Sequence, residues 1–189
     1  MIGILALQGA FAEHEACLDR LGFQYTEIRK KEHLSAPLDA IIIPGGESTV
    51  MNKLLKDLDM MNILRNMIQE GLPVFGTCAG LILLSKEVDG GESGLSTMDI
   101  RTARNAYGRQ LGSFSTSGSF CGCEIPMIFI RAPYIESAGP DVEILSKTDG
   151  RITSARQGKQ LVTAFHPELT DDLTVHRYFL REIAGLTID

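Results

Sequence analysis

The chain has 189 residues, of which 44% are hydrophobic and 22% charged, and its formal net charge is −6. This length and composition suit one globular domain spanning residues 1–189. The acidic balance argues against nucleic-acid binding, because phosphate recognition needs a basic face. The apolar residues 1–7 are too short for a signal peptide or a membrane span. We therefore expect a cytoplasmic protein with no membrane partner.

Apolar runs alternate with helical patterns through the first half of the chain. Strands are predicted at Ile2–Leu7, Gln24–Arg29, Ala40–Ile43 and Pro73–Gly76, and helices at Glu13–Leu21, Ser48–Glu70 (in one or two pieces) and Ala79–Lys86. This β-α-β-α order predicts an α/β fold of three layers, with an open, mostly parallel sheet flanked by helices, as in flavodoxin-like folds.

The second half is less regular, and residues 90–119 are rich in Gly and Ser without an assignable pattern. Strands are predicted at Met127–Arg131, Val142–Lys147, Arg151–Ala155 and Leu161–Phe165, and a closing helix at Asp171–Ala184. Ligands of open α/β sheets bind at the carboxyl ends of the strands. The segments 44–46, 76–78 and 165–166 all follow predicted strands, so we expect them to share one edge of the sheet.

The sharpest motif is Gly76-Thr-Cys78-Ala-Gly80, which places a potential nucleophile on a strand-to-helix turn between two glycines. Such a turn exposes the side chain above the sheet and needs small neighbours. A helix N-terminus favours the thiolate, and the free N–H of Ala79 can face an oxyanion. The structural alternative is a buried core thiol beside a tight turn.

A cysteine nucleophile needs a base, and His166 is the histidine that follows a predicted strand. Glu168 lies two residues further on, close enough to bind the same imidazole. A carboxylate on one ring nitrogen fixes the tautomer and leaves the other nitrogen for the thiol proton. Cys78, His166 and Glu168 thus supply a nucleophile, a base and an orienting group, although His-Pro-Glu alone is equally typical of a surface loop.

The remaining histidines and cysteines are given structural roles. Cys17 lies on a helical pattern and is expected in the core. Cys121 and Cys123 form one C-x-C pair without a second pair or nearby histidine, which is a poor zinc site, so we expect neither metal nor cofactor. Three histidines are expected on the solvated surface: His14, His33 and His176.

Residues 44–48, Pro-Gly-Gly-Glu-Ser, form a glycine turn that leads into a predicted helix. Backbone N–H groups there can bind an anion, although no Gly-Lys-Ser/Thr follows as in a phosphate-binding loop. A purely structural turn is the local alternative. The position beside the cysteine turn favours a second oxyanion donor.

Together, Gly76–Gly80, residues 44–48 and Phe165–Glu168 resemble the class I, or triad, glutamine amidotransferases. Residues 5–14, Arg104–Gln110 and 129–133 narrow this resemblance, which runs nearly end to end, to the glutaminase-subunit family of pyridoxal 5'-phosphate synthase. The resemblance implies the class I glutamine amidotransferase fold. It also implies that L-glutamine is the substrate and that a (β/α)8-barrel synthase subunit receives the ammonia.

The resemblance assigns individual roles as well. It implies that Cys78 is the nucleophile, His166 the base and Glu168 its orienter. Gly46 and Ala79 would supply the oxyanion N–H groups, and Gln8 would lie at the partner interface. Glutamine would be held by Gly46, Glu47, Ser48, Arg104, Ile130 and Arg131. A zwitterionic ligand needs such a mixture of donors and acceptors.

Three alternatives to this function remain open. The chain could be the glutaminase subunit of another synthase, which isolation of the partner would decide. It could be a free-standing cysteine hydrolase, which would be highly active alone. A non-enzymatic, glutaminase-like regulatory protein would not be alkylated at its thiol by a glutamine analogue.

Overall fold

The computed structural model describes residues 1–104 and 112–188. Its strands are β1 (Ile2–Leu5), β2 (Tyr25–Ile28), β3 (Ala40–Ile43), β4 (Val74–Thr77), β5 (Ser85–Asp89), β6 (Met98–Ala103), β7 (Ser113–Phe120), β8 (Cys123–Ile130), β9 (Tyr134–Ala138), β10 (Glu143–Thr148), β11 (Arg151–Gln157) and β12 (Gln160–Thr163). Its helices are α1 (Phe11–Arg20), α2 (Ser48–Asp57), α3 (Met61–Gln69), α4 (Ala79–Leu84) and α5 (Thr174–Tyr178), with 3-10 turns η1 (Lys31–Ser35) and η2 (Pro167–Leu169) and a π-helical turn η3 (Phe179–Ile183).

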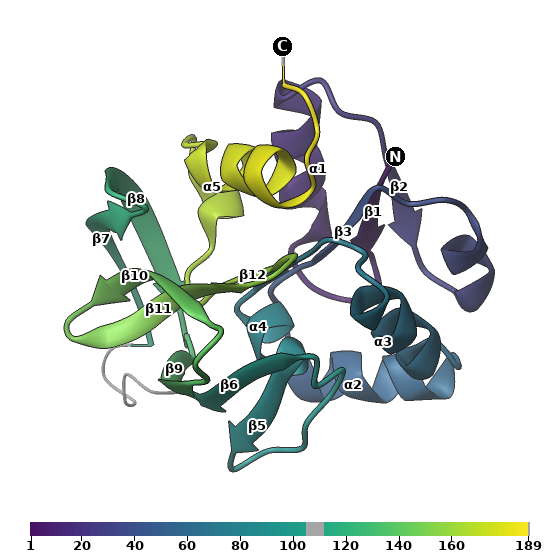
Figure 1. Ribbon diagram of the computed structural model, residues 1–189, viewed down its shortest axis with the longest axis horizontal. Coiled ribbons are helices and arrows are strands. Elements are labelled where there is room, and N and C mark those ends of the chain that lie inside the picture. The colour runs from purple at the N-terminus through teal and green to yellow at the C-terminus, as the bar shows by residue number, and fades with distance from the viewer. Residues whose placement is uncertain (105–111, 189) are drawn as a thin grey trace.

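The main sheet has the strand order β2-β1-β3-β4-β12-β11-β9-β6-β5, and β10 pairs with β11. Its first five strands run parallel, and β11 continues it antiparallel to β12. Helices α1 and α5 lie on one face of the sheet, and α2, α3 and α4 on the other (Figure 1). The predicted three-layer α/β fold with a mostly parallel sheet is confirmed.

The central strands are fully buried along their whole length, as the apolar runs predict. Every residue of β1, β3 and β4 is buried. Parallel strands covered by helices on both faces read as continuous hydrophobic runs, because neither face meets water. The predicted helical stretch 48–70 forms two helices, α2 and α3, separated by Leu58–Met60.

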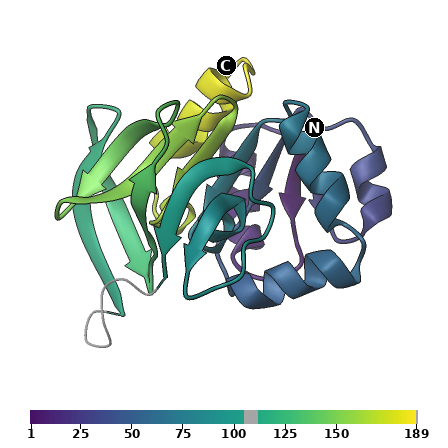
Figure 2. The same cartoon turned by 60° about the horizontal axis from the view of Figure 1, so that its bottom comes forward.

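The stretch that carried no sequence pattern contains strands. It includes β6 and most of β7, which pairs with β8 as a separate antiparallel hairpin. Figure 2 shows this hairpin at the end of the molecule away from α2 and α3. Its turn is formed by Cys121 and Gly122, both with positive φ. Cys121 and Cys123 are exposed free thiols. Ser at every second position of β7 hid its alternation.

Helix α4 ends earlier than predicted. It stops at Leu84 instead of Lys86, and the chain continues directly as β5. The buried Ser85 hydroxyl donates to the Leu81 carbonyl at 2.7 Å and also lies 2.7 Å from Thr102 Oγ1. These hydrogen bonds tie residue 85 to β6 and let the chain leave the helix.

The closing helix begins later than predicted. Helix α5 starts at Thr174, whose N–H donates to Asp172 Oδ1 at 2.8 Å, and it passes into the π-helical η3 at Phe179. A side-chain acceptor two residues ahead of a helical N–H is typical of a helix start. Residues 171–173 therefore belong to the loop rather than to the helix.

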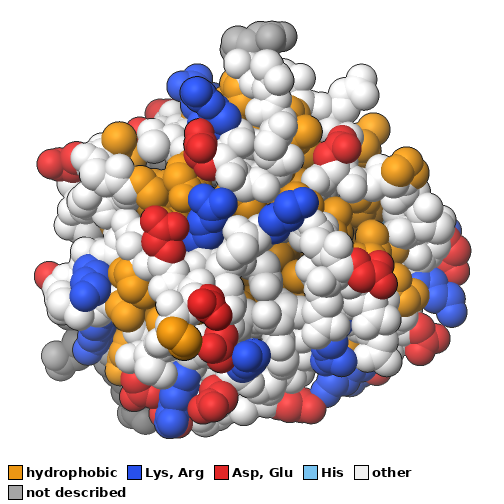
Figure 3. Space-filling model, viewed as in Figure 1, with side chains coloured by type: hydrophobic (Ala, Val, Ile, Leu, Met, Phe, Trp, Pro, Cys, Tyr) orange, Lys and Arg blue, Asp and Glu red, His pale blue; other side chains and the backbone are white. Residues whose placement is uncertain are grey.

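The face of the molecule in Figure 3 carries Lys and Arg side chains among Asp and Glu side chains, without a separate basic area. None of the described helices combines the length and apolarity needed to cross a membrane.

Candidate active site

The nucleophile candidate lies between two adjacent parallel strands. In the sheet, Thr77 of β4 is opposite Thr163 of β12, and the Cys78 N–H donates to the Thr163 carbonyl at 2.8 Å. Cys78 follows β4 by one residue, and His166 follows β12 by three. Neighbouring strand ends therefore bring together two residues that are far apart in the sequence.

Cys78 forms a sharp, strained turn at the start of α4. Its backbone has φ 48° and ψ −95°, a conformation that side-chain-bearing residues rarely adopt. A Cβ on Gly80 would run into the Ile43 carbonyl, and one on Gly76 would lie 2.7 Å from the Gly80 carbonyl carbon. The glycines of the motif thus let the turn pack against β3 and α4, as predicted for a nucleophile turn.

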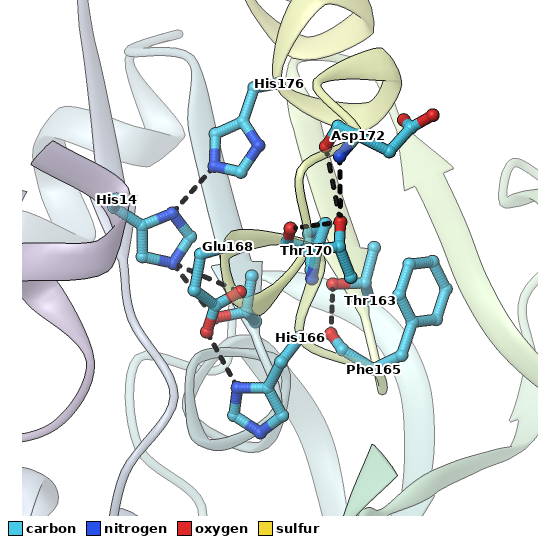
Figure 4. Close-up of polar contacts among 10 residues, drawn as sticks. His14, Thr163, Phe165, His166, Glu168, Thr170, Asp172 and His176 are labelled. Carbon is cyan, nitrogen blue, oxygen red and sulfur yellow. Dashed lines mark hydrogen bonds and ion pairs between the residues drawn. The ribbon is translucent and has the colours of Figure 1, made fainter. Parts of the chain in front are cut away.

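His166 is oriented by Glu168 on η2. Its Nδ1 lies 2.7 Å from Glu168 Oε1 (Figure 4). Its backbone N–H donates to the Ile128 carbonyl of β8 at 2.8 Å. The Glu168 side chain is fully buried and that of His166 nearly so. Because Nδ1 is bound to the carboxylate, Nε2 is the ring nitrogen that is free to exchange a proton with a reacting group.

The electrostatics of His166 favour its protonated form. Burial lowers its pKa, but hydrogen bonds to Cys78 and Glu168 outweigh this effect and raise the pKa to about 10. A carboxylate behind the ring and a sulfur in front both stabilise the imidazolium. The arrangement keeps a protonated imidazole beside Cys78.

The glycine turn of residues 44–46 packs against both reactive side chains. A Cβ on Gly45 would lie 2.9 Å from His166 Nδ1 and 3.4 Å from Cys78 Cβ. The Gly45 carbonyl accepts the Ala10 N–H at 2.9 Å, which joins this turn to the segment before α1. The three strand ends expected to share one edge of the sheet do so.

In front of Cys78 lies a cavity of about 390 Å³. It is lined by Gln8, Gly46, Glu47, Ser48, Cys78, Ile82, Arg104, Ile130 and Arg131. All six residues predicted to hold the substrate are in this lining, whereas Ala79 and His166 lie outside it. The sequence reasoning missed Ile82, although a residue four positions after Cys78 on a helix faces the same side.

Glu47 and Gln8 organise one wall of this cavity. The Glu47 carboxylate accepts the Thr49 and Val50 N–H groups at 3.2 and 2.8 Å, which caps α2. Burial raises the pKa of Glu47, but these hydrogen bonds lower it below its ordinary value overall. Arg104 lies 3.7 Å from the same carboxylate, and Gln8 Oε1 accepts the Glu47 N–H at 2.7 Å.

Two histidines expected on the surface are instead buried behind the triad. His14 and His176 are fully buried, and His14 Nδ1 lies 2.9 Å from His176 Nε2 (Figure 4). His14 Nε2 lies 3.7 Å from Glu168 Oε2. The expectation was wrong because both residues share a helix face with apolar residues: His14 precedes Cys17 and Leu18 by three and four positions.

Cys17, His33 and the segment 104–110 are the remaining residues for which the sequence made a prediction. Cys17 is buried, as predicted for a core residue. His33 is half-buried and its Nδ1 lies 2.9 Å from the Glu27 carbonyl, so it too is more than a solvated side chain. Of the segment 104–110 that narrowed the resemblance, only Arg104 lies within the described residues.

A parallel α/β sheet with a cysteine on a strand-to-helix turn, near a histidine that a glutamate binds, defines an α/β protein with a candidate Cys-His-Glu site. The chain belongs to the SNO glutamine amidotransferase family, whose model matches residues 4–185. The family resemblance seen in the sequence is thereby confirmed.

Similar proteins cover nearly the whole chain. A pyridoxal 5'-phosphate synthase subunit PdxT from Methanocorpusculum labreanum is 55% identical over 97% of this chain and 98% of its own length. Another from Carboxydothermus hydrogenoformans is 52% identical over 96% and 97%. A solved glutamine amidotransferase is 44% identical, with a TM-score of 0.92 over 98% of this chain and 99% of its own.

Proposed function

We propose that this chain is the glutaminase subunit of a pyridoxal 5'-phosphate synthase. Residues 1–189 would act as one domain that hydrolyses L-glutamine to L-glutamate and ammonia. The observation that carries the proposal is that Cys78 and His166 both pack against Gly45, with Glu168 bound to His166 Nδ1 and a cavity lined by Cys78. This set provides a nucleophile, an acid–base group and an orienting carboxylate in the order that acyl transfer needs.

The first half-reaction forms a thioester. The Cys78 thiolate attacks the side-chain carbonyl carbon of glutamine, and the carbonyl oxygen becomes an oxyanion. We assign its stabilisation to the N–H groups of Gly46, which lines the cavity, and of Ala79, which follows Cys78 in the chain. The His166 imidazolium then gives its Nε2 proton to the amide nitrogen, the carbon–nitrogen bond breaks and ammonia leaves.

The second half-reaction restores the enzyme. His166 is now neutral and takes a proton from water, whose oxygen attacks the thioester carbon. The carbon–sulfur bond breaks, glutamate is released and the thiolate–imidazolium pair forms again. Glu168 keeps the ring in one orientation throughout, because its bond to Nδ1 leaves Nε2 facing the reacting atoms.

Binding of the substrate fits the charges of the cavity. Glu47 offers a carboxylate to the α-ammonium of glutamine, and Arg104 offers a guanidinium to its α-carboxylate. Ser48, Ile130 and Arg131 complete the pocket. Arg131 has φ 42°, so the backbone after β8 is strained where it borders Cys78.

The partner follows from the relatives. Those named above are subunits of pyridoxal 5'-phosphate synthase, which supports another subunit of that synthase as the acceptor of ammonia. The family resemblance implies that this acceptor is a (β/α)8 barrel. We place Gln8 at the interface with that subunit, since it joins the cavity wall to the loop before α1.

The test is glutamate release by the purified chain with and without the synthase subunit. Low basal activity should rise on mixing, and Cys78→Ala should abolish turnover while glutamine still binds. Cys123→Ala, which removes an exposed thiol of the β7–β8 hairpin, is the matched control and should retain full activity. Turnover by Cys78→Ala in the mixed complex would refute the assignment.

A further inference from the structure

The carboxylate of Glu168 has a second oxygen that the triad leaves unused. Glu168 Oε1 binds His166, whereas Oε2 is buried and finds no hydrogen-bond partner among the described residues. A buried carboxylate oxygen without a donor is costly. The polar group facing it is His14 Nε2 of α1, at 3.7 Å (Figure 4).

The proton positions on the two buried histidines follow from their partners. His176 Nδ1 has no partner among the described residues, so a proton there would be a buried, unpaired donor. The favoured tautomer carries the proton on Nε2 and donates it to His14 Nδ1, 2.9 Å away. His14 then carries its own proton on Nε2, which lies 3.3 Å from Thr77 Oγ1 and faces Glu168 Oε2.

We propose that His14 is a positioning residue for the triad: its Nε2–H holds the second oxygen of Glu168, and His176 fixes the tautomer that makes this possible. This inference rests on the proposed function. Because Thr77 precedes Cys78, His14 also touches the strand that carries the nucleophile. One ring thereby links the strand of the sulfur to the carboxylate that orients the base.

Both histidines are suited to donate without carrying charge. Burial, then the neighbouring His176 and His166, lower the pKa of His14 well below its ordinary value. Burial, and then Arg20, lowers the pKa of His176 to about 4. A neutral His14 stabilises the carboxylate without competing as a cation with the His166 imidazolium. Glu168 also borders a pocket lined by Glu13, Cys17, Arg20 and Asp171. Burial raises the pKa of the Cys17 thiol to about 11.

Packing holds the donor close to its acceptor. The His14 and His176 rings both stand edge-on to Phe75 of β4, with centroids 5.9 and 5.6 Å away. At 3.7 Å the His14–Glu168 contact is longer than a hydrogen bond, and catalytic hydrogen bonds commonly tighten only when substrate binds. A closure of roughly 0.7 Å would complete it.

Two substitutions of His14 separate donation from packing. In His14→Asn the shorter amide reaches only the position of the native Nδ1, so the donor to Glu168 is lost. In His14→Gln the amide nitrogen reaches the position of the native Nε2, so the donor to Glu168 is kept. With the synthase subunit present, we expect His14→Asn to lower kcat by about 10- to 100-fold with little change in KM. His14→Gln should recover most of kcat.

A second readout needs no glutamine turnover. The rate of Cys78 alkylation by iodoacetamide is measured against pH on the chain alone. Without its donor, Glu168 holds the His166 imidazolium less firmly, so in His14→Asn the acidic limb of the alkylation profile should move up by at least about 0.5 pH unit. His14→Gln should leave it in place. If wild type releases no glutamate with its partner, the proposed function fails, and this comparison still tests His14.

Two further variants keep the inference falsifiable. In a Glu168→Gln background, His14→Asn should cost far less than in wild type, because the carboxylate that needs the donor is gone. His176→Leu should move kcat and the alkylation limb in the same direction as His14→Asn, by a smaller factor. The inference is overturned if His14→Asn and His14→Gln lose the same amount of kcat, if these losses add to that of Glu168→Gln, and if the alkylation profile does not shift along the pH axis. His14 would then be a packing residue only.

Discussion

Gly45 offers the sharpest test of how closely the active site is packed. In Gly45→Ala the new Cβ would lie 2.9 Å from His166 Nδ1, closer still to Cε1, and 3.4 Å from Cys78 Cβ. Carbon contacts lie at about 3.5–4.0 Å, so the imidazole must retreat by roughly 1 Å. A misplacement of this size costs about 100-fold in rate. We therefore expect kcat to fall by about two orders of magnitude.

The assay is glutamate release with a saturating synthase subunit, together with the urea midpoint of each variant. Gly3→Ala is the matched control, because its Cβ also meets close neighbours in a part of β1 remote from His166. These neighbours are the half-buried Leu38, with Cδ1 at 3.0 Å, and the buried Ile28, with Cγ1 at 3.2 Å. Both variants should lose about 1–3 kcal/mol of stability from overpacking. Only Gly45→Ala should lose turnover per folded molecule. Wild-type kcat in that variant would show that His166 does not work from its observed position.

Three further predictions concern stability and binding. The pKa of His176 is lowered from 6.5 to about 4, so the unfolded chain binds this proton first and the free energy of unfolding should fall as pH drops between these values. His176→Leu should flatten that slope in urea titrations; an unchanged slope would contradict the assignment. Gly80→Ala should cost about 1–3 kcal/mol by calorimetry, because its Cβ meets the Ile43 carbonyl, and an unchanged Tm would refute this. Glu47→Ala should lose about 1 kcal/mol of stability with the helix cap and should also raise KM, whereas Glu47→Gln should keep the cap and raise only KM. An equal Tm for the two variants would contradict the capping role.

The sequence predicts the parallel half of the fold because one physical rule governs it. Strands β1, β3 and β4 are covered on both faces, so each is an unbroken apolar run between turn residues. The antiparallel half is half-exposed and uses Ser, Thr and Gly, whose alternation is faint. Strand β7 escaped prediction for this reason. Strand β9 escaped because its partner β6 lies 31 to 38 positions earlier in the sequence.

The candidate site was predictable from strand ends alone. Cys78 and His166 each follow a buried strand, and the carboxyl ends of adjacent parallel strands must meet. The sequence could not give the order of the strands, which makes β4 and β12 neighbours although β5 to β11 intervene. That adjacency places the imidazole against the sulfur.

The buried histidines His14 and His176 differ from the solvated positions that their polarity predicts. The polarity of the ring predicts a solvated histidine, yet the position of the residue on the helix decides its exposure before polarity does. His176 precedes Phe179 and Leu180 by three and four positions, on the face that packs against β4. Burial of a neutral imidazole is tolerable when each N–H finds an acceptor, and two histidines satisfy most of each other's requirement. Two histidines on apolar helix faces thus predict a buried, hydrogen-bonded pair. Because this pair lies beside Glu168, its remaining donor, His14 Nε2–H, is available to that carboxylate.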